Sequence, residues 1–462
     1  MMDRRQFLEM MGLSLAGAAL PGTAPFSWAS DHSSPGNSTT PLMLCFEASG
    51  GWDPTLHCDP HAHPNYAYYG ESNIRQTASG LLYAPQRQPT WPDDQNASDI
   101  EDDYNVGGTG NREAFFEKYQ NDLLVINGID NQTVSHDVGR RNAWSGTTRE
   151  GHPCLAALHA SVDGIGQAMS FLTSGGSDAT AGLLVATRAG DPNRLLSLVE
   201  PYKASIGPSA GSELLPDSIQ ERIKDAQDAR HARMASQSRL PRRAEVMTRF
   251  NNFRAVESSS MAGLTSALDT IGALTVPRPA DNPLIENVEL AVAGMKAGIT
   301  TSANVFLGGF DTHQDHWDYE DGQRILLKNY FEAVDYAAVI LKELNLYERT
   351  LFMMGSDFGR TIRNNDDEMG KDHWQVSSMM LMGYGVTGGR TVGQTFVEDG
   401  LNGVSASKLN SQTLALDDNG IYLSPAHIHL AIRDKLGILG STNSQKFSFG
   451  DDIELLERLL NG

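Results

Sequence analysis

Cysteine is scarce in this chain, with Cys45, Cys58 and Cys154 as the only three among 462 residues. An odd number allows at most one internal disulfide, so no disulfide framework holds the fold together. Cys45 lies in the apolar run 42–46, and we expect it in the core. A Cys58–Cys154 bridge is an open alternative in an oxidising compartment. The chain has no CxxC pair, which removes support for a zinc-ribbon or dithiol redox role.

Positive charge is also scarce. The chain has 36 Lys and Arg residues against 57 Asp and Glu residues, for a formal net charge of -21. Such an acidic protein is unsuited to nucleic acid or anionic lipid as its main partner. Solubility explains the charge most simply, and local cationic pockets could still bind anions.

The sequence also lacks a Walker loop, a GxSxG elbow and a GxGxxG turn behind a strand.

No apolar run at the N-terminus is long enough to span a bilayer, which takes about 20 apolar residues. Arg4 and Arg5 precede a mildly apolar stretch over 10–24, and a small-x-small cleavage site follows. We interpret residues 1–29 as a twin-arginine signal rather than a membrane anchor, and residues 30–40 as a flexible lead-in. The sequence therefore predicts export to the periplasm or the cell exterior, with no integral membrane segment in the mature chain.

Apolar runs alternate with amphipathic segments along the rest of the chain. Runs that predict buried strands lie at 41–48, 122–128, 183–187, 304–308, 349–355 and 378–383. Helices are expected at 113–120, 137–144, 151–160, 284–297, 322–346 and 427–436, and one or two long surface helices within 212–255. This alternation predicts an α/β fold, a mainly parallel sheet with helices on both faces. We expect one domain over 41–462, with insertions at about 57–115 and 205–285.

Polar side chains follow several of the predicted strands. Ligands of open α/β sheets bind beyond the carboxyl ends of the strands. The residues at or after these ends are Asp53, Ser135, Asp311, His313, Asp357, Asp372 and His373. Such Asp and His groups suit Zn²⁺ or Mn²⁺, and two ions about 4 Å apart would suit an in-line phosphoryl displacement. Each Asp alone could equally be a turn residue or a helix N-cap.

The motifs GGWD, SHD, GGFDTH, SDFGRT and KDHW occur in this order behind the twin-arginine pattern. In this combination the chain resembles the bacterial family named domain of unknown function 1501, from about residue 41 to about residue 440. That family is in turn similar to the alkaline phosphatase and sulfatase superfamily. The resemblance implies an alkaline-phosphatase-like fold with a metal-dependent site for phosphate or sulfate esters.

The resemblance also implies roles for single residues. The implied metal ligands are Asp53, Asp311, His313, Asp357, Asp372 and His373. Asp53 and Asp357 would share one ion, and Asp311, His313 and His373 would bind the other. Ser135 would be the nucleophile, with Thr133 as the second choice. Two departures from the pattern stand out: Phe358 occupies a position where the superfamily has His, and Asp311 and His313 are two apart rather than four.

Several cationic residues lie close to these motifs in the sequence. Arg360 could clamp an oxyanion in bidentate fashion, or could simply form a structural ion pair. Arg140 and Arg141 follow Ser135 on the same predicted helix and could face the site, whereas Lys371 is expected to be solvated. The histidines between 57 and 63 resemble a metal tract, but the spacing and the flanking prolines favour an exposed loop.

These features give three hypotheses. The first is an exported, metal-dependent hydrolase that takes a small anionic ester or a surface glycan as its substrate. The second is a non-catalytic secreted binding or structural protein on the same fold. The third is a metal-dependent transferase that moves a phosphoryl group onto surface glycans or lipids. The expected cofactor is a divalent metal, with Zn²⁺ as the first choice and Mn²⁺ or Ca²⁺ as alternatives.

Overall fold

The computed structural model describes most of the chain after residue 38. The described residues are 39–62, 71, 74–85, 112–189, 212–237, 263–318, 321–365, 370–398, 400–450 and 452–462. All of them belong to the unit Thr39–Gly462. The predicted signal at 1–29, most of the lead-in, and His63 lie outside the described residues. The twin-arginine signal therefore stays a prediction.

An eight-stranded sheet forms the centre of the fold. In spatial order its strands are β12 (Arg390–Val392), β4 (Leu124–Asp130), β11 (Val376–Gly383), β8 (Thr350–Ser356), β1 (Leu42–Ala48), β7 (Ser302–Leu307), β5 (Phe171–Thr173) and β6 (Thr187–Arg188). Neighbouring strands pair in parallel, except that β11 runs antiparallel to both β4 and β8. The prediction of a mainly parallel sheet is confirmed.

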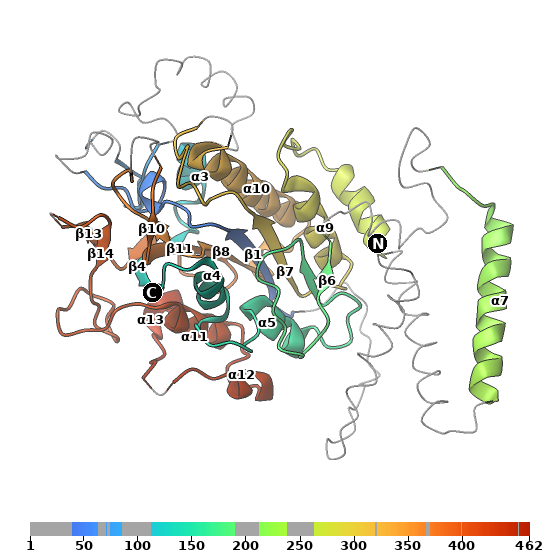
Figure 1. The fold of residues 1–462 in the computed structure, drawn as a ribbon. Coiled ribbons are helices and arrows are strands. Elements are labelled where there is room, and N and C mark those ends of the chain that lie inside the picture. Colours follow the sequence, from blue (N-terminus) through green and yellow to red (C-terminus); the bar gives the residue numbers. More distant parts are fainter. Residues whose placement is uncertain are drawn as a thin grey trace. The chain divides into compact units, whose positions relative to one another are not determined.

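Helices cover both faces of this sheet (Figure 1). One face carries α3 (Arg112–Tyr119), α9 (Ile285–Lys296) and α10 (Gln323–Glu343), and the other carries α4 (His136–Ser145), α5 (Leu155–Asp163), α11 (Pro425–Lys435), α12 (Thr442–Lys446) and α13 (Arg458–Asn461). In β1, Leu44 and Phe46 pack on the first face and Met43 and Cys45 on the second. Both faces of the strand are apolar because both are covered, as the continuous apolar runs predict.

Helix α10 shows how the apolar pattern fixes an element. Leu327, Tyr330, Val334 and Leu341 recur at helical spacing, and all are fully buried. Tyr330 also donates its hydroxyl hydrogen to the carbonyl of Phe46 at 2.6 Å, which ties the helix to β1. Burial of each such large apolar side chain contributes about 1.5–3 kcal/mol.

At the β5–β6 edge of the sheet, the prediction differs from the structure. The strand expected at 183–187 is reduced to the two residues of β6, and the preceding residues form a turn region whose leucines pack on the second core. The strand β5 was not predicted, because three residues are too few to show a period. Within the region 212–255, the long helix α7 (Asp217–Ser236) confirms one surface helix, and residues 238–255 lie outside the described residues.

Short elements complete the described part. They are η1 (Pro54–Leu56), β2 (Arg75–Gln76), β3 (Leu82–Tyr83), η4 (Tyr347–Arg349), β9 (Gly359–Arg360), β10 (His373–Trp374), β13 (Thr395–Val397) and β14 (Val404–Ala406). The three cysteines are buried free thiols, so the alternative of a Cys58–Cys154 disulfide is not realised in the structure. None of the helices in the described ranges combines the length and apolar character that crossing a membrane would require.

Candidate metal centre

The loops after β1, β7 and β8 lie next to one another because these three strands are neighbours in the sheet. The loop after β8 contributes Asp357, whose carboxylate accepts a hydrogen bond of 3.1 Å from the backbone of Gly50 in the loop after β1. The loop after β7 contributes Asp311. Strand β4 leads into α4, whose first residue is His136. The carboxyl edge of the sheet therefore gathers groups from distant parts of the chain.

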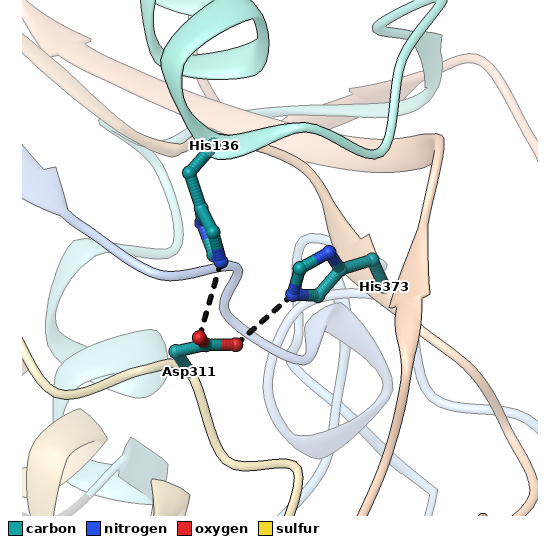
Figure 2. Close-up of side chains that lie close together, drawn as sticks. All are labelled: His136, Asp311 and His373. Atoms are coloured by element: carbon teal, nitrogen blue, oxygen red, sulfur yellow. Dashed lines mark hydrogen bonds and ion pairs between the residues drawn. The ribbon is translucent and has the colours of Figure 1, made fainter.

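Three side chains converge at this edge, as Figure 2 shows: His136, Asp311 and His373. The Nε2 atom of His136 lies 3.2 Å from one carboxylate oxygen of Asp311, and the Nε2 atom of His373 lies 3.0 Å from the other. One potential ligand atom of each residue lies within 4.8 Å of the others. Among the described residues, this is the group whose geometry suits a metal ion.

His313 adds a fourth potential ligand. Its Nε2 atom lies 2.9 Å from Nε2 of His373 and 3.3 Å from Oδ1 of Asp311. Ligand atoms around a tetrahedral zinc ion, at about 2.0–2.1 Å from it, lie about 3.3 Å apart. The distances of Nε2 of His313 from Nε2 of His373 and from Oδ1 of Asp311 are therefore close to those between two ligand atoms of one zinc ion.

The orientation of the imidazoles supports this arrangement. Nδ1 of His136 pairs with Oδ2 of Asp357 at 3.0 Å, and Nδ1 of His373 donates to the backbone carbonyl of Val134 at 2.7 Å. With the hydrogen on Nδ1, each Nε2 atom carries the lone pair that a metal ion requires. Nε2 of His136 is buried, has no hydrogen-bond partner and faces Asp311. Its lone pair is therefore placed where a metal ion could bind it.

His313 follows the same pattern, with its Nδ1 atom 2.9 Å from Oδ1 of Asp372. Its Nε2 atom and that of His373 then face each other as two lone pairs at 2.9 Å. Two bare nitrogens repel at this distance unless a proton or a cation lies between them. The group of His136, Asp311 and His373 thus fits a divalent metal such as Zn²⁺, and His313 adjoins it beside His373 and Asp311. Asp357 and Asp372 are outer partners that orient the rings of His136 and His313.

The charges at the centre are consistent with this assignment. Partial burial raises the pKa of Asp311, but the hydrogen bond from Arg360 and the positive charge of that side chain outweigh it and hold that pKa below its usual range. Asp311 is therefore an ionised carboxylate at neutral pH. The hydrogen bond with Asp357 raises the pKa of His136, and the same increase in basicity makes Nε2 a better donor to a cation.

Arg360 lies directly behind Asp311 and is only 1% exposed. Its Nη2 atom lies 2.7 Å from Oδ1 of Asp311. Its other contacts are with backbone carbonyls, those of Gly50, Gly51, Phe310 and Lys371. Of the two alternatives for Arg360, the structure shows the ion pair. We assign it a positioning role, because it joins three loops and fixes the Asp311 carboxylate.

Asp53 stands outside this group and belongs to a second buried cluster. One carboxylate oxygen contacts the ammonium of Lys371 and lies 3.2 Å from Nε2 of His316, and the other accepts the hydroxyl hydrogen of Thr55 at 2.6 Å. Burial raises the pKa of Asp53, but the charge of Lys371 outweighs it and lowers that pKa. The prediction that Lys371 is solvated is wrong. The residue is fully buried because it balances the charge of Asp53.

The remaining predicted residues lie around the centre. Ser135 is exposed and is the N-cap of α4, directly before His136, and its backbone N–H donates to the hydroxyl of Thr133 at 3.1 Å. Phe358 is fully buried beneath the centre, with its ring centroid 4.9 Å from that of His136 and 4.4 Å from that of His373. Phe358 thus supports the imidazoles by packing.

The cationic residues of α4 have local partners. Arg140 pairs with Asp137 at 3.3 Å, and Arg141 donates to the carbonyl of Thr148 at 2.9 Å. Both side chains therefore interact with residues of α4 and of the turn that follows it. The prediction that they could face the site gains no support from these contacts.

The expected exposed loop near residue 60 is wrong in part. His57 is fully buried and packs against the ring of Trp52 at 4.4 Å between centroids. His61 lies close to Asp59 and Thr395. Pro60 is buried and misled the prediction, because proline stiffens a buried turn as readily as an exposed one.

Sequence reasoning missed His136 as a candidate ligand, although it quoted the SHD motif that contains it. The available signal was its position, the first residue of a helix directly after a buried strand. Reasoning from the motif fell on the neighbouring Ser135 instead, because the implied role at this point was a nucleophile.

Comparisons with known proteins place the chain in a family. The family model described as protein of unknown function (DUF1501) matches residues 43–417. A search of the curated proteins gives no match.

Solved structures of three enzymes share a weak likeness. A 2-O GAG sulfatase is 9% identical, with a TM-score of 0.32 over 92% of this chain and 74% of the other. The alkaline phosphatase from the Antarctic bacterium TAB5 is 10% identical, with a TM-score of 0.28 over 74% of this chain and 92% of the other. The phosphonate monoester hydrolase from Silicibacter pomeroyi is 10% identical, with a TM-score of 0.26 over 74% and 73%. Likenesses at this level carry no argument about activity. The family model matches most of the length of this chain, which shows that the chain belongs to the DUF1501 family of proteins of unknown function.

Proposed function

We propose that the protein is an exported, metal-dependent hydrolase of phosphate or sulfate esters. One observation carries the proposal: the Nε2 atoms of His136 and His373 converge on the carboxylate of Asp311 at the carboxyl edge of the sheet, with Nε2 of His313 beside His373 and Asp311. Zn²⁺ is the first choice for this nitrogen-rich set, because Ca²⁺ takes oxygen ligands and Mn²⁺ prefers more of them.

A bound divalent ion would supply positive charge to the ester oxygens and lower the pKa of a nearby hydroxyl group or water. The chain itself supplies a hydroxyl at Ser135, which is exposed and adjacent in sequence to the ligand His136. The first backbone N–H groups of α4 are available to an oxyanion there, since Ser135 makes no side-chain cap. In this scheme Ser135 Oγ forms a bond to the phosphorus or sulfur atom as the bond to the ester oxygen breaks, and the serine proton leaves with the alcohol. Water then hydrolyses the serine ester, which releases phosphate or sulfate and restores the hydroxyl.

A non-catalytic binding protein is the second candidate. The observation in its favour is that Arg360 and Lys371 are both buried and already paired with carboxylates, so neither is placed as a clamp for an oxyanion. Within the described part of the chain, the hydrolase would then bind its anionic substrate through the metal ion and the helix N-terminus.

Metal analysis and ester turnover test the proposal on the purified mature protein. We expect bound zinc and turnover of an aryl phosphate or aryl sulfate. Ser135→Ala should retain the metal and lose turnover, whereas His373→Ala should lose both. Ser236→Ala, an exposed serine at the end of α7, is the matched control and should change neither.

Two results would contradict the hydrolase, and a third would contradict the role of Ser135. Absence of bound metal together with no turnover after addition of Zn²⁺, Mn²⁺ or Ca²⁺ would favour the binding protein. Turnover with a lipid-linked donor but with no simple ester would indicate a transferase. Unchanged turnover in Ser135→Ala would remove the serine from its role.

Export by the twin-arginine route is part of the proposal and rests on the pattern of residues 1–29. Replacing Arg4 and Arg5 together by Lys should leave the precursor inside the cell, and cell fractionation would detect it. Normal export of that variant would contradict the route.

A further inference from the structure

We propose that the Lys371 ammonium is the built-in cation of a second carboxylate site, centred on Asp53, so that the chain takes one divalent ion rather than two. The claim of one ion rests on the proposed metal centre. The claim about Lys371 stands on the geometry of the second cluster and is tested separately.

The Asp53 cluster has the composition of a cation site. Asp53 and His316 are fully buried, and Thr55 is 3% exposed. Thr55 donates both its hydroxyl and its backbone N–H to Oδ1 of Asp53, at 2.6 and 3.1 Å. Oδ2 of Asp53 faces His316 at 3.2 Å and Lys371 at closer range. A buried carboxylate requires a nearby positive charge, because water is excluded from it.

Lys371 is the residue that supplies this charge. Its side chain is fully buried, and its ammonium lies 5.4 Å from the centre of the Trp317 ring. Nδ1 of His316 lies 2.8 Å from the hydroxyl of Thr312, an arrangement in which Nε2 carries the hydrogen and points it at Asp53. With Lys371 and this hydrogen both directed at Asp53, the carboxylate has no free position for a metal ion.

The same residue also positions the metal centre. The backbone N–H of Lys371 donates to the carbonyl of Thr312 at 3.1 Å, and its carbonyl accepts from Arg360 at 2.8 Å. Lys371 is thus held at three points immediately before Asp372 and His373. The ammonium joins the loop after β1 to the loop after β7 and to the segment that carries His373.

Replacing Lys371 should therefore convert the cluster into a true metal site. In Lys371→Ala the lost side chain leaves room for an ion and its waters, whereas Lys371→Met removes the charge but keeps most of the volume. We expect wild type to bind one equivalent of zinc, Lys371→Ala to bind a second, and Lys371→Met to bind no second equivalent. Adding Asp53→Asn to Lys371→Ala should abolish the second equivalent.

Titration calorimetry with Zn²⁺ alone and thermal unfolding with and without Zn²⁺ give the readouts, and neither requires activity. Measurements in a His373→Ala background separate the two claims, since that change removes the first site and leaves the Asp53 cluster intact. Absence of bound zinc from the wild-type protein would contradict the proposed function. Two equivalents in wild type, or a folded Lys371→Ala that gains none, would overturn the inference.

A charge-balanced variant covers the case in which Lys371→Ala does not fold. Asp53→Asn combined with Lys371→Met removes both charges and should unfold at a higher temperature than Lys371→Met alone. A double variant no more stable than the single one would overturn the role of the ammonium as the partner of Asp53.

Discussion

At the residue scale, each imidazole of the proposed metal centre offers Nε2 because an oxygen atom holds the opposite nitrogen. Asp357 does this for His136, and Asp372 does it for His313. Such outer carboxylates fix the tautomer and the ring orientation, and losing one typically costs 10–100-fold in metal affinity.

We expect Asp357→Asn to weaken zinc binding about 10–100-fold, since the amide cannot serve as the anionic partner of the His136 imidazole. Competition with a chromogenic chelator would measure the affinity. Asp137→Asn is the matched control on the first turn of α4, because that side chain is 86% exposed and pairs only with Arg140 among the described ion pairs. An affinity unchanged in Asp357→Asn would remove the outer-partner role.

Glu47 is a second residue whose environment makes a measurable prediction. It is fully buried on β1, accepts hydrogen bonds from Ser177 and Asn304, and burial raises its pKa from 4.5 to about 7. A carboxyl with a raised pKa in the folded state favours folding while it is protonated. That contribution is fully present below pH 4.5, declines as the pH rises, and is lost above about pH 7.

Glu47→Gln should therefore resemble wild type near pH 4 and exceed it in stability near pH 8, by on the order of 3 kcal/mol. Urea unfolding at several pH values would measure this. Glu343→Gln, at the exposed end of α10, is the control and should follow the wild-type pH dependence. If Glu47→Gln also followed the wild-type pH dependence, the pKa of the Glu47 carboxyl would not be raised in the folded protein.

At the scale of elements, the centre depends on how tightly the turns after β1 and β7 approach each other. Gly50 has a φ of +117°, and a Cβ atom there would lie 2.4 Å from the backbone nitrogen of Asp311. Only glycine fits both the backbone conformation and the space. The contact between the loops after β1 and β7 therefore requires glycine at position 50.

Gly50→Ala should destabilise the fold and weaken metal binding, because the loop that carries Asp311 must move away. Gly151→Ala is the matched control: its φ is +81°, but no atom lies within 4 Å of the added carbon. The control should show backbone strain of about 1–3 kcal/mol and unchanged metal affinity. Denaturant unfolding and zinc titration of both variants would test this, and equal losses in the two would contradict the contact argument.

At the scale of the whole molecule, the proposed metal centre joins the loops that follow strands of one sheet to the segment before β11. Its donor residues come from α4, from the loop after β7 and from β10. An ion bound to such distant segments stabilises the folded state, because the unfolded chain offers no comparable site.

Removal of metal with a chelator should lower the midpoint of thermal unfolding. Free zinc at about 100 times its dissociation constant contributes about 2.7 kcal/mol to the folded state. His373→Ala should unfold at the same temperature with and without chelator, while His231→Ala on α7 should retain the wild-type shift. Scanning calorimetry would measure the midpoints, and a wild type insensitive to the chelator would contradict a structural contribution from the ion.

The sequence by itself determined the layers of the fold and the edge at which polar groups collect. Apolar runs such as 42–46 and 350–354 form strands that are buried on both faces, and the residues after them emerge at one edge of the sheet. These properties are local, because the length and period of an apolar run dictate the strand, and the strand's direction dictates where its last residue lies. Asp311 and Asp357 were found in this way.

Only the tertiary structure decided what each of these groups does. Asp53 and Lys371 lie 318 positions apart in the sequence, and the contact between them makes one a paired anion and the other a buried cation. His136 faces Asp311 because α4 begins at the carboxyl end of β4. The role of a charged side chain depends on the partners that exclude water from it, and no local pattern of residues encodes partners from distant segments.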